Sequence, residues 1–155
     1  MEVPISMRGE LAKVKGIGDV DLEIWVGCAG NFSLAVGYAA LLWPEFELVN
    51  NHLVRAGTTE DAVQEFGRSA GATRRSVEAT VNHLHLWDLH YVGCKDCTAD
   101  KLLALGKVLK EMHEARLQWQ FPDRPCTVTL SIPEDAQDLG GYQLTFWQND
   151  LSVTA

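Results

Sequence analysis

A stretch of twenty residues without a charged side chain, from Ile24 to Trp43, limits the possible folds more than any other feature of this sequence. Twenty uncharged residues are the nominal length of a helix that spans a membrane. Three glycines interrupt the stretch, however, and polar Asn31 stands near its middle. Because these residue types are typical of turns and helix caps, a strand, a turn and a buried helix explain the stretch better than one membrane span. The sequence therefore predicts a soluble protein.

Alternation of apolar and polar side chains predicts strands near both ends of the chain. In residues 20–26 apolar side chains alternate largely with acidic ones, which is typical of a strand with one face in water. Asn50 and Asn51 separate two short apolar runs, and we expect a hairpin there because asparagine tolerates the left-handed turn conformation. The predicted strands are residues 8–15, 20–26, 46–49, 53–54, 126–132 and 142–147, with a turn at residues 16–19.

Capping residues and apolar spacings of three and four predict four helices. Asn31 can cap a helix that Pro44 ends, and this helix is expected to be buried because it is apolar nearly all round. Further helices are predicted from Thr58 or Thr59 to about Arg68, from Thr73, and from Thr98 to just before Pro122. The inner face of the last and longest one is predicted to carry Leu102, Leu105, Leu109, Met112, Ala115 and Trp119.

The predicted order of strands and helices indicates the α+β class. We expect an antiparallel sheet of about five to six strands, with three or four helices packed mainly on one face. The chain has 155 residues and neither an internal repeat nor a low-complexity linker. Residues 1–155 are therefore expected to form a single globular domain.

The net charge of −8 arises in two blocks that contain neither lysine nor arginine, residues 16–54 and 125–155. Since these blocks coincide largely with predicted strands, we expect one acidic surface on the sheet. Such a surface repels the phosphates of nucleic acids and attracts a basic protein. The acids predicted to bind this partner are Asp21, Glu23, Glu134 and Asp138. The alternative is that the acidity serves solubility alone.

Residues 83–97 contain the densest group of side chains that bind metals. Imidazole and thiolate are ligands for zinc. The candidate metal ligands are His83, His85, His90, Cys94 and Cys97. The alternative is structural, because histidine and aspartate also finish helix ends and hydrogen-bond the following loop. Cys94 and Cys97 have the spacing of a redox motif, but the βαβ context of such motifs is absent from the predicted order.

The sequence does not predict an enzyme. No serine lies in a nucleophile elbow, and Glu111, His113 and Glu114 do not form the two-histidine zinc motif. No catalytic residues are therefore predicted. The start of the sequence has no apolar leader, so we expect a cytoplasmic protein whose four cysteines are free thiols.

Four phrases of the sequence, in this order, resemble a loosely defined group of small bacterial proteins with no known activity. They are Leu42-Trp43-Pro44-Glu45-Phe46, Val77-Glu78 with Asn82-His83-Leu84-His85-Leu86-Trp87-Asp88-Leu89, Phe121-Pro122-Asp123-Arg124 and Thr145-Phe146-Trp147-Gln148. The resemblance implies a bacterial accessory protein carried on mobile elements. It also implies that the Asn-His-Leu-His phrase is a fold element as much as a site.

Three hypotheses about function follow. The first is a non-catalytic binding protein whose acidic surface meets a basic protein, as an immunity protein meets a toxin. The second is a small zinc protein that uses the histidines and cysteines of residues 83–97. The third is a small-ligand module with a pocket lined by Trp43, Trp87 or Trp119. Exposed strands and the high tryptophan content also suggest a homodimer.

Overall fold

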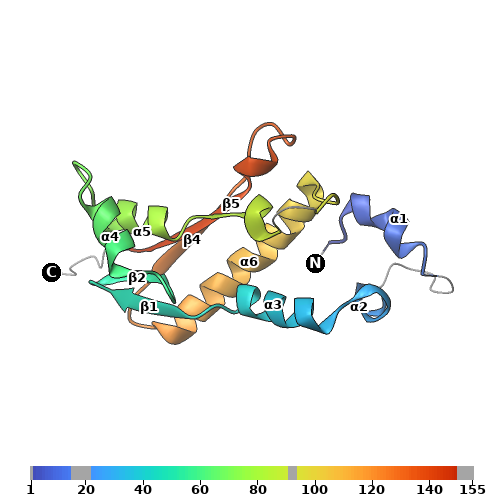
Figure 1. The fold of residues 1–155 in the computed structure, drawn as a ribbon, viewed down its shortest axis with the longest axis horizontal. Helices are drawn as coiled ribbons and strands as arrows, with labels where there is room; N and C mark the ends of the chain where they lie inside the picture. The colour runs from blue at the N-terminus through green and yellow to red at the C-terminus, as the bar shows by residue number, and fades with distance from the viewer. Residues whose placement is uncertain (1, 15–21, 91–93, 150–155) are drawn as a thin grey trace.

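The chain folds around one long helix, α6 (Ala99–Gln120), against which a β-hairpin packs (Figure 1). The computed structural model describes residues 2–14, 22–90 and 94–149. The other helices within these ranges are α1 (Arg8–Leu11), α2 (Leu22–Ala29), α3 (Phe32–Leu42), α4 (Glu60–Gly67) and α5 (Arg74–Val81). The strands are β1 (Phe46–Val49), β2 (His52–Arg55), β3 (Leu84–His85), β4 (Cys126–Ser131) and β5 (Gln143–Gln148). Three short 3-10 helices are η1 (Ile5–Met7), η2 (Leu86–Leu89) and η3 (Leu139–Gly141).

The main core lies between α6 and the antiparallel pair β4–β5. Leu144 and Phe146 of β5 are buried, as the alternation in the sequence predicts. Gly106 allows α6 to approach this layer closely, because a Cβ there would lie 2.7 Å from methyl carbons of Leu86 and Leu130. The buried side chains of this core are Phe46, Leu53, Leu86, Leu102, Leu109, Leu117, Val128, Tyr142, Leu144 and Phe146.

A second, smaller core packs the β1–β2 hairpin against α4 and α5. Asn50 and Asn51 have φ angles of 50° and 64°, so the predicted asparagine turn is confirmed. Thr59 caps α4, and Thr73 forms a capping box with Ser76 at the start of α5. The buried residues of this core are Val54, Val63 and Val77. Local turn and cap chemistry therefore forms this region as the sequence predicts.

Two buried polar side chains, Glu78 of α5 and Asn82 at its C-terminal cap, join the two sheets. The Glu78 carboxylate accepts hydrogen bonds from the backbone N–H of Leu53 (2.9 Å) and of Gln148 (2.6 Å). The Asn82 amide donates to the carbonyl oxygens of Leu53 (2.8 Å) and Phe146 (3.3 Å). Side chains of a helix therefore bond to strand edges that would otherwise pair with each other.

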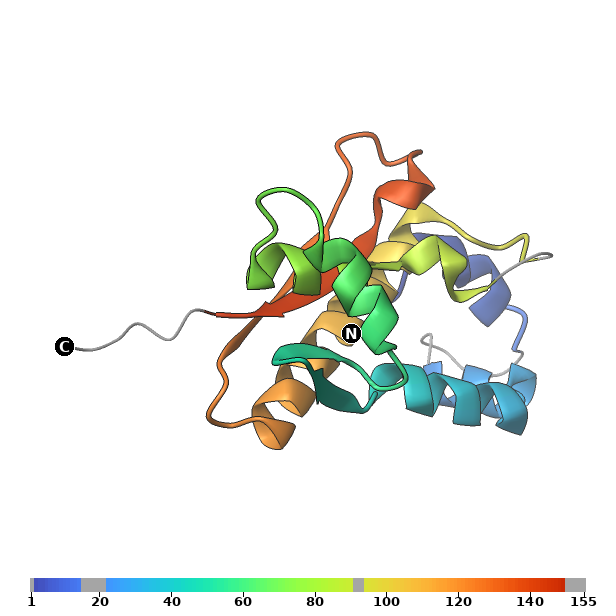
Figure 2. The same ribbon diagram turned by 60° about the vertical axis from the view of Figure 1, so that its left-hand side comes forward.

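The α+β class is confirmed, but the prediction of one sheet with about five to six strands is wrong. The structure contains a two-stranded sheet, β1-β2, and a three-stranded sheet of order β3-β5-β4. The edge of β5 beyond β3 bonds to Glu78 and Asn82, so β2 does not extend the sheet there. The helices also do not share one face, because α6 covers a face of the larger sheet whereas α5 lies along its edge (Figure 2).

The two N-terminal strands are predicted wrongly. Residues 8–11 form α1, and residues 22–29 form α2. A segment of alternating apolar and polar residues forms a strand only where a neighbouring strand hydrogen-bonds to its backbone and a core covers one of its faces. The structure provides neither at α2, which contains no buried residue. The turn expected at residues 16–19 and the start of the strand expected at 20–26 lie outside the described residues.

Helix α3 begins at its Asn31 cap and ends before Pro44, as predicted, but its predicted burial is wrong. The Asn31 side chain accepts a hydrogen bond from Leu34 N (3.2 Å). Neither α2 nor α3 contains a buried residue, and together they form an arm, residues 22–42, along one side of the molecule (Figures 1 and 2). Gly30 forms the elbow between them, since a Cβ there would lie 2.3 Å from the carbonyl oxygen of Val26. Within the described ranges, no helix combines the length and apolarity needed to cross a membrane.

Candidate functional site

A pocket of about 580 Å³ lies where α3, η2 and the first turns of α6 meet. Its volume is within the range of small-ligand sites in proteins. Leucines from η2 and α6 provide its apolar lining, and titratable side chains provide its polar lining. The lining residues are Tyr38, Leu86, Trp87, Asp88, Leu89, His90, Cys94, Asp96, Cys97, Lys101, Leu102 and Leu105.

Tyr38 is the residue of α3 that lines the pocket. Its hydroxyl is hydrogen-bonded to Nε2 of His90, and the two rings meet edge to face with centroids 5.6 Å apart. Burial raises the pKa of the Tyr38 hydroxyl, and the nearby Cys94 and Asp96 raise it further. The hydroxyl is therefore protonated at neutral pH. This contact joins residues that are 52 positions apart in the sequence.

Asp96 organises the segment that precedes α6. Its Oδ1 accepts a hydrogen bond from the Cys94 thiol (2.9 Å), and its Oδ2 lies 3.2 Å from Nζ of Lys101. The hydrogen bond with Cys94 and the contacts with Lys101 lower the pKa of Asp96. Lys101 also contacts Glu10 of α1 at 3.3 Å, so it ties the N-terminal segment to the pocket.

The two pocket cysteines are protonated thiols at neutral pH. The hydrogen bond to Asp96 raises the pKa of Cys94, and burial raises the pKa of Cys97. A thiol with a raised pKa is a poor nucleophile. The pair therefore lacks the activation that redox cysteines show, even though it precedes a helix.

Asp88 is the one lining carboxylate without a compensating partner among the residues that the structure describes. The charges of Asp96 and Lys101 neutralise each other across 3.2 Å, whereas Asp88 has no hydrogen bond or ion pair with any residue that the structure describes. Its neighbour Trp87 is 49% exposed and also lines the pocket. The pocket thus carries a net negative charge next to an aromatic surface.

Three of the five predicted metal ligands, His90, Cys94 and Cys97, line this pocket. The other two lie elsewhere: the rings of His83 and His85 are 4.4 Å apart on β3 and its approach. His83 Nε2 bonds Gln143 Oε1 at 2.8 Å, and His85 Nδ1 lies 3.0 Å from the Gly140 carbonyl oxygen. The structure therefore divides the predicted cluster into two places. In the described part of the chain, no three histidine, cysteine or acidic side chains are arranged to hold a metal ion.

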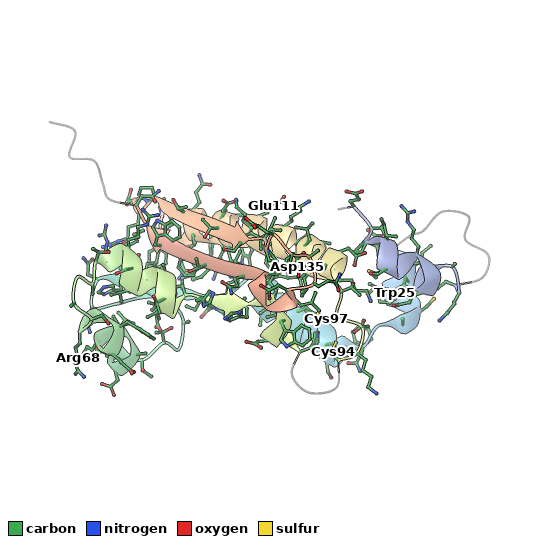
Figure 3. The ribbon with its side chains drawn as sticks, turned by 90° about the horizontal axis from the view of Figure 1, so that it is seen from above. Trp25, Arg68, Cys94, Cys97, Glu111 and Asp135 are labelled. Atoms are coloured by element: carbon green, nitrogen blue, oxygen red, sulfur yellow. The ribbon has the colours of Figure 1, made fainter. Side chains whose placement is uncertain are left out.

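The acids predicted to bind a basic partner are also distributed over different elements. Glu23 lies on α2, whereas Glu134 and Asp138 are exposed in the loop between β4 and β5. Figure 3 shows Trp25 on α2 well apart from Asp135 in that loop. Asp21 lies outside the described residues. The first acidic block folds mainly as α2 and α3 rather than as strands, so the expected single acidic sheet surface does not form.

Of the three tryptophans predicted to line a ligand pocket, Trp87 does so. Trp43 and Trp119 instead both contact the Arg116 guanidinium, whose central carbon lies 5.3 and 4.6 Å from their ring centroids. The sequence does not indicate Tyr38 and Lys101 as site residues, although both line the pocket. Neither belongs to a local motif with Cys94, and only the folded chain brings them together.

Comparisons with protein-family models, with curated proteins and with solved structures gave no match. The chemistry of the site is therefore the basis for a functional proposal.

Proposed function

We propose that this protein binds a small organic cation, a molecule with an apolar body and an amine or similar group. The observation that carries the proposal is the pocket of about 580 Å³ with an apolar leucine lining and a net negative polar lining. An apolar body would displace water from Leu86, Leu89 and Leu102. This proposal makes the third hypothesis from the sequence specific.

The polar lining supports a cation rather than an anion. Asp88 supplies a carboxylate that is not paired with any described residue, whereas the ammonium of Lys101 is held by Asp96 and Glu10. Trp87 and Tyr38 offer aromatic rings, and a cation over a ring face gains about 0.5–2 kcal/mol. An anionic ligand would have to compete with two carboxylates for Lys101.

The same lining supports binding without catalysis. The thiols of Cys94 and Cys97 and the hydroxyl of Tyr38 all have raised pKa values, so none of them is prepared as a nucleophile. We therefore propose that the pocket holds its ligand without transforming it.

Thermal-shift measurements with phenethylamine and phenylacetate test this proposal, because the two probes share an apolar body and differ in charge. Phenethylamine should raise the melting temperature in a concentration-dependent manner, and phenylacetate should not. The substitutions Trp87→Ala and Asp88→Asn should abolish the shift. The matched controls Trp119→Ala and Asp61→Asn, at exposed positions outside the pocket, should keep it. The proposal fails if phenethylamine and longer arylamines leave the melting temperature unchanged, or if the pocket variants bind as the wild type does.

A basic protein partner remains a second candidate, favoured by the exposed acids of the β4–β5 loop. Glu134, Asp135 and Asp138 lie there with no lysine or arginine in residues 125–155. A lysine-rich partner would associate faster at low salt. Binding of polylysine, measured against ionic strength, tests this candidate. The triple variant Glu134→Gln, Asp135→Asn, Asp138→Asn should flatten the salt dependence, and an unchanged dependence would exclude the loop.

A further inference from the structure

The arm formed by α2 and α3 exposes apolar side chains along its whole length. The exposed fractions are 93% for Phe32, 72% for Val36, 55% for Val26, 52% for Leu34 and 41% for Ile24. Trp43, at the end of α3, is 41% exposed. An aromatic side chain buries roughly 150–250 Å² when it is covered, so Phe32, at 93% exposure, presents most of such an area to solvent. Exposed apolar surface that forms a patch marks interaction sites on proteins.

One face of α3 contacts the molecule and the opposite face does not. Tyr38 reaches the pocket, and Leu41 and Leu42 pack partly against the main core. Phe32 and Val36 are four residues apart and therefore lie together on the other side of the helix. Both are exposed, so the outward face of α3 presents two neighbouring apolar side chains that nothing in the described chain covers.

We propose that this outward face of the arm binds the same face of a second copy of the chain. The charge distribution favours this occupant. Each copy carries a net charge of −8, so two copies repel each other over most of their surfaces. The stretch from Ile24 to Trp43 contains no charged residue, and two such faces can meet without bringing like charges together. A two-fold axis would place Phe32 of one copy near Val36 of the other.

The charge distribution disfavours the other occupants. A membrane surface would need lysine or arginine beside the apolar face, and residues 16–54 contain neither. A basic protein would find no acid between Ile24 and Trp43.

Phe32 and Val36 lie at the centre of the proposed contact. Since a standard interface covers roughly 800 Å² on each partner, backbone and small residues around them on the arm complete it. The pairing is independent of the ligand pocket, since it uses the face of α3 opposite to Tyr38.

Sedimentation-velocity ultracentrifugation of the full chain tests this proposal. The wild type should sediment as a dimer. Phe32→Glu and Val36→Glu should each raise the dissociation constant by on the order of a hundredfold or more, because a buried apolar side chain is replaced by a charge facing its symmetry mate. The matched control is Ile5→Glu, which changes another side chain that is 72% exposed but lies outside the arm, and it should leave the dimer intact. Circular dichroism confirms that each variant remains folded.

Four results would overturn the proposal. They are a wild type that remains monomeric up to its solubility limit, arm variants that dimerise as the wild type does, loss of the dimer in Ile5→Glu, and a monomer that co-sediments with phosphatidylcholine vesicles. The last result would assign the face to lipid.

Discussion

The layer around α6 and the arm of α2 and α3 are both rich in apolar residues, yet they differ completely in burial. Helix α6 buries Leu102, Leu109 and Leu117 against β4 and β5. The arm is more apolar than α6 but buries no residue. The difference teaches that apolar content alone does not place a segment in the core. Burial requires a partner surface of matching shape, which the hairpin provides for α6 and which the described chain provides only for the inner side of α3.

The largest expected effect comes from removing one large apolar side chain from each region. Leu109→Ala should lower the free energy of unfolding by about 3–4 kcal/mol, because Leu109 is completely buried and its loss leaves a cavity. Val36→Ala should change it by less than about 0.5 kcal/mol when measured on the monomer, since Val36 is exposed. Urea denaturation at low protein concentration measures both. A large loss for Val36→Ala would show that the arm is packed after all.

Lowering the pH from 7 to 4 should lower the free energy of unfolding by about 3 kcal/mol, because His113 of α6 becomes protonated. Burial lowers the pKa of His113 to about 4, from an ordinary value of 6.5, although its Nδ1 lies 2.8 Å from the Leu109 carbonyl oxygen. The folded state therefore favours neutral His113, so stability is complete above pH 6.5 and declines as the pH falls towards 4. Denaturation at pH 7 and pH 4 measures the loss.

The variant His113→Leu distinguishes this histidine from the other titrating groups. It removes the proton site while keeping an apolar side chain against Phe46 and Phe146. The loss of stability between pH 7 and pH 4 should become smaller by roughly 3 kcal/mol in the variant. An equal loss in the wild type and the variant would exclude His113 as the cause.

The smallest expected effect compares the cap of α4, a helix packed on the second core, with the cap of α3 in the arm. Thr59→Ala should destabilise the protein by about 1 kcal/mol, because the Thr59 side chain caps α4, which packs on the second core. Asn31→Ala should leave the global transition within about 0.5 kcal/mol and reduce only the helicity of the arm. Urea denaturation and circular dichroism report the two effects separately. Equal losses of global stability in the two variants would contradict the distinction between the packed helix α4 and the exposed arm.

The sequence predicts those parts of the fold that depend on local chemistry. The asparagine turn at residues 50–51, the caps at Thr59 and Thr73 and the helix end before Pro44 are all confirmed. Each depends on a few neighbouring residues, so the sequence contains the required information.

The parts that depend on distant contacts are predicted less well. On α6, Leu102 and Leu109 are buried as predicted, but Trp119 is exposed and Leu117 is buried. The buried face is rotated from the predicted one because Gly106 contacts β4 and η2 closely, and a glycine is not counted in an apolar pattern. The separation of the sheets by Glu78 and Asn82 likewise depends on α5 lying beside both β2 and β5.

The candidate site shows the same difference between features that depend on neighbouring residues and features that depend on distant contacts. The dense run of residues 83–97, which predicts a metal site, overlaps the segment that lines the pocket, since His90, Cys94 and Cys97 all lie there. His83 and His85 turn away because residues 84–85 pair with β5 as β3. Tyr38 and Lys101 come from other helices, and no local pattern connects them with Cys94. A zinc ion on this cluster stays a prediction, which elemental analysis of untagged protein tests.

Hydrogen exchange at two protein concentrations tests the contrast between layer and arm most directly. In dilute, monomeric protein, the amides of α6 should be strongly protected and those of α3 weakly protected. At a concentration where the chain dimerises, protection of α3 should increase in the wild type but not in Phe32→Glu, while α6 stays unchanged. Strong protection of α3 in the monomer, independent of concentration, would contradict the account.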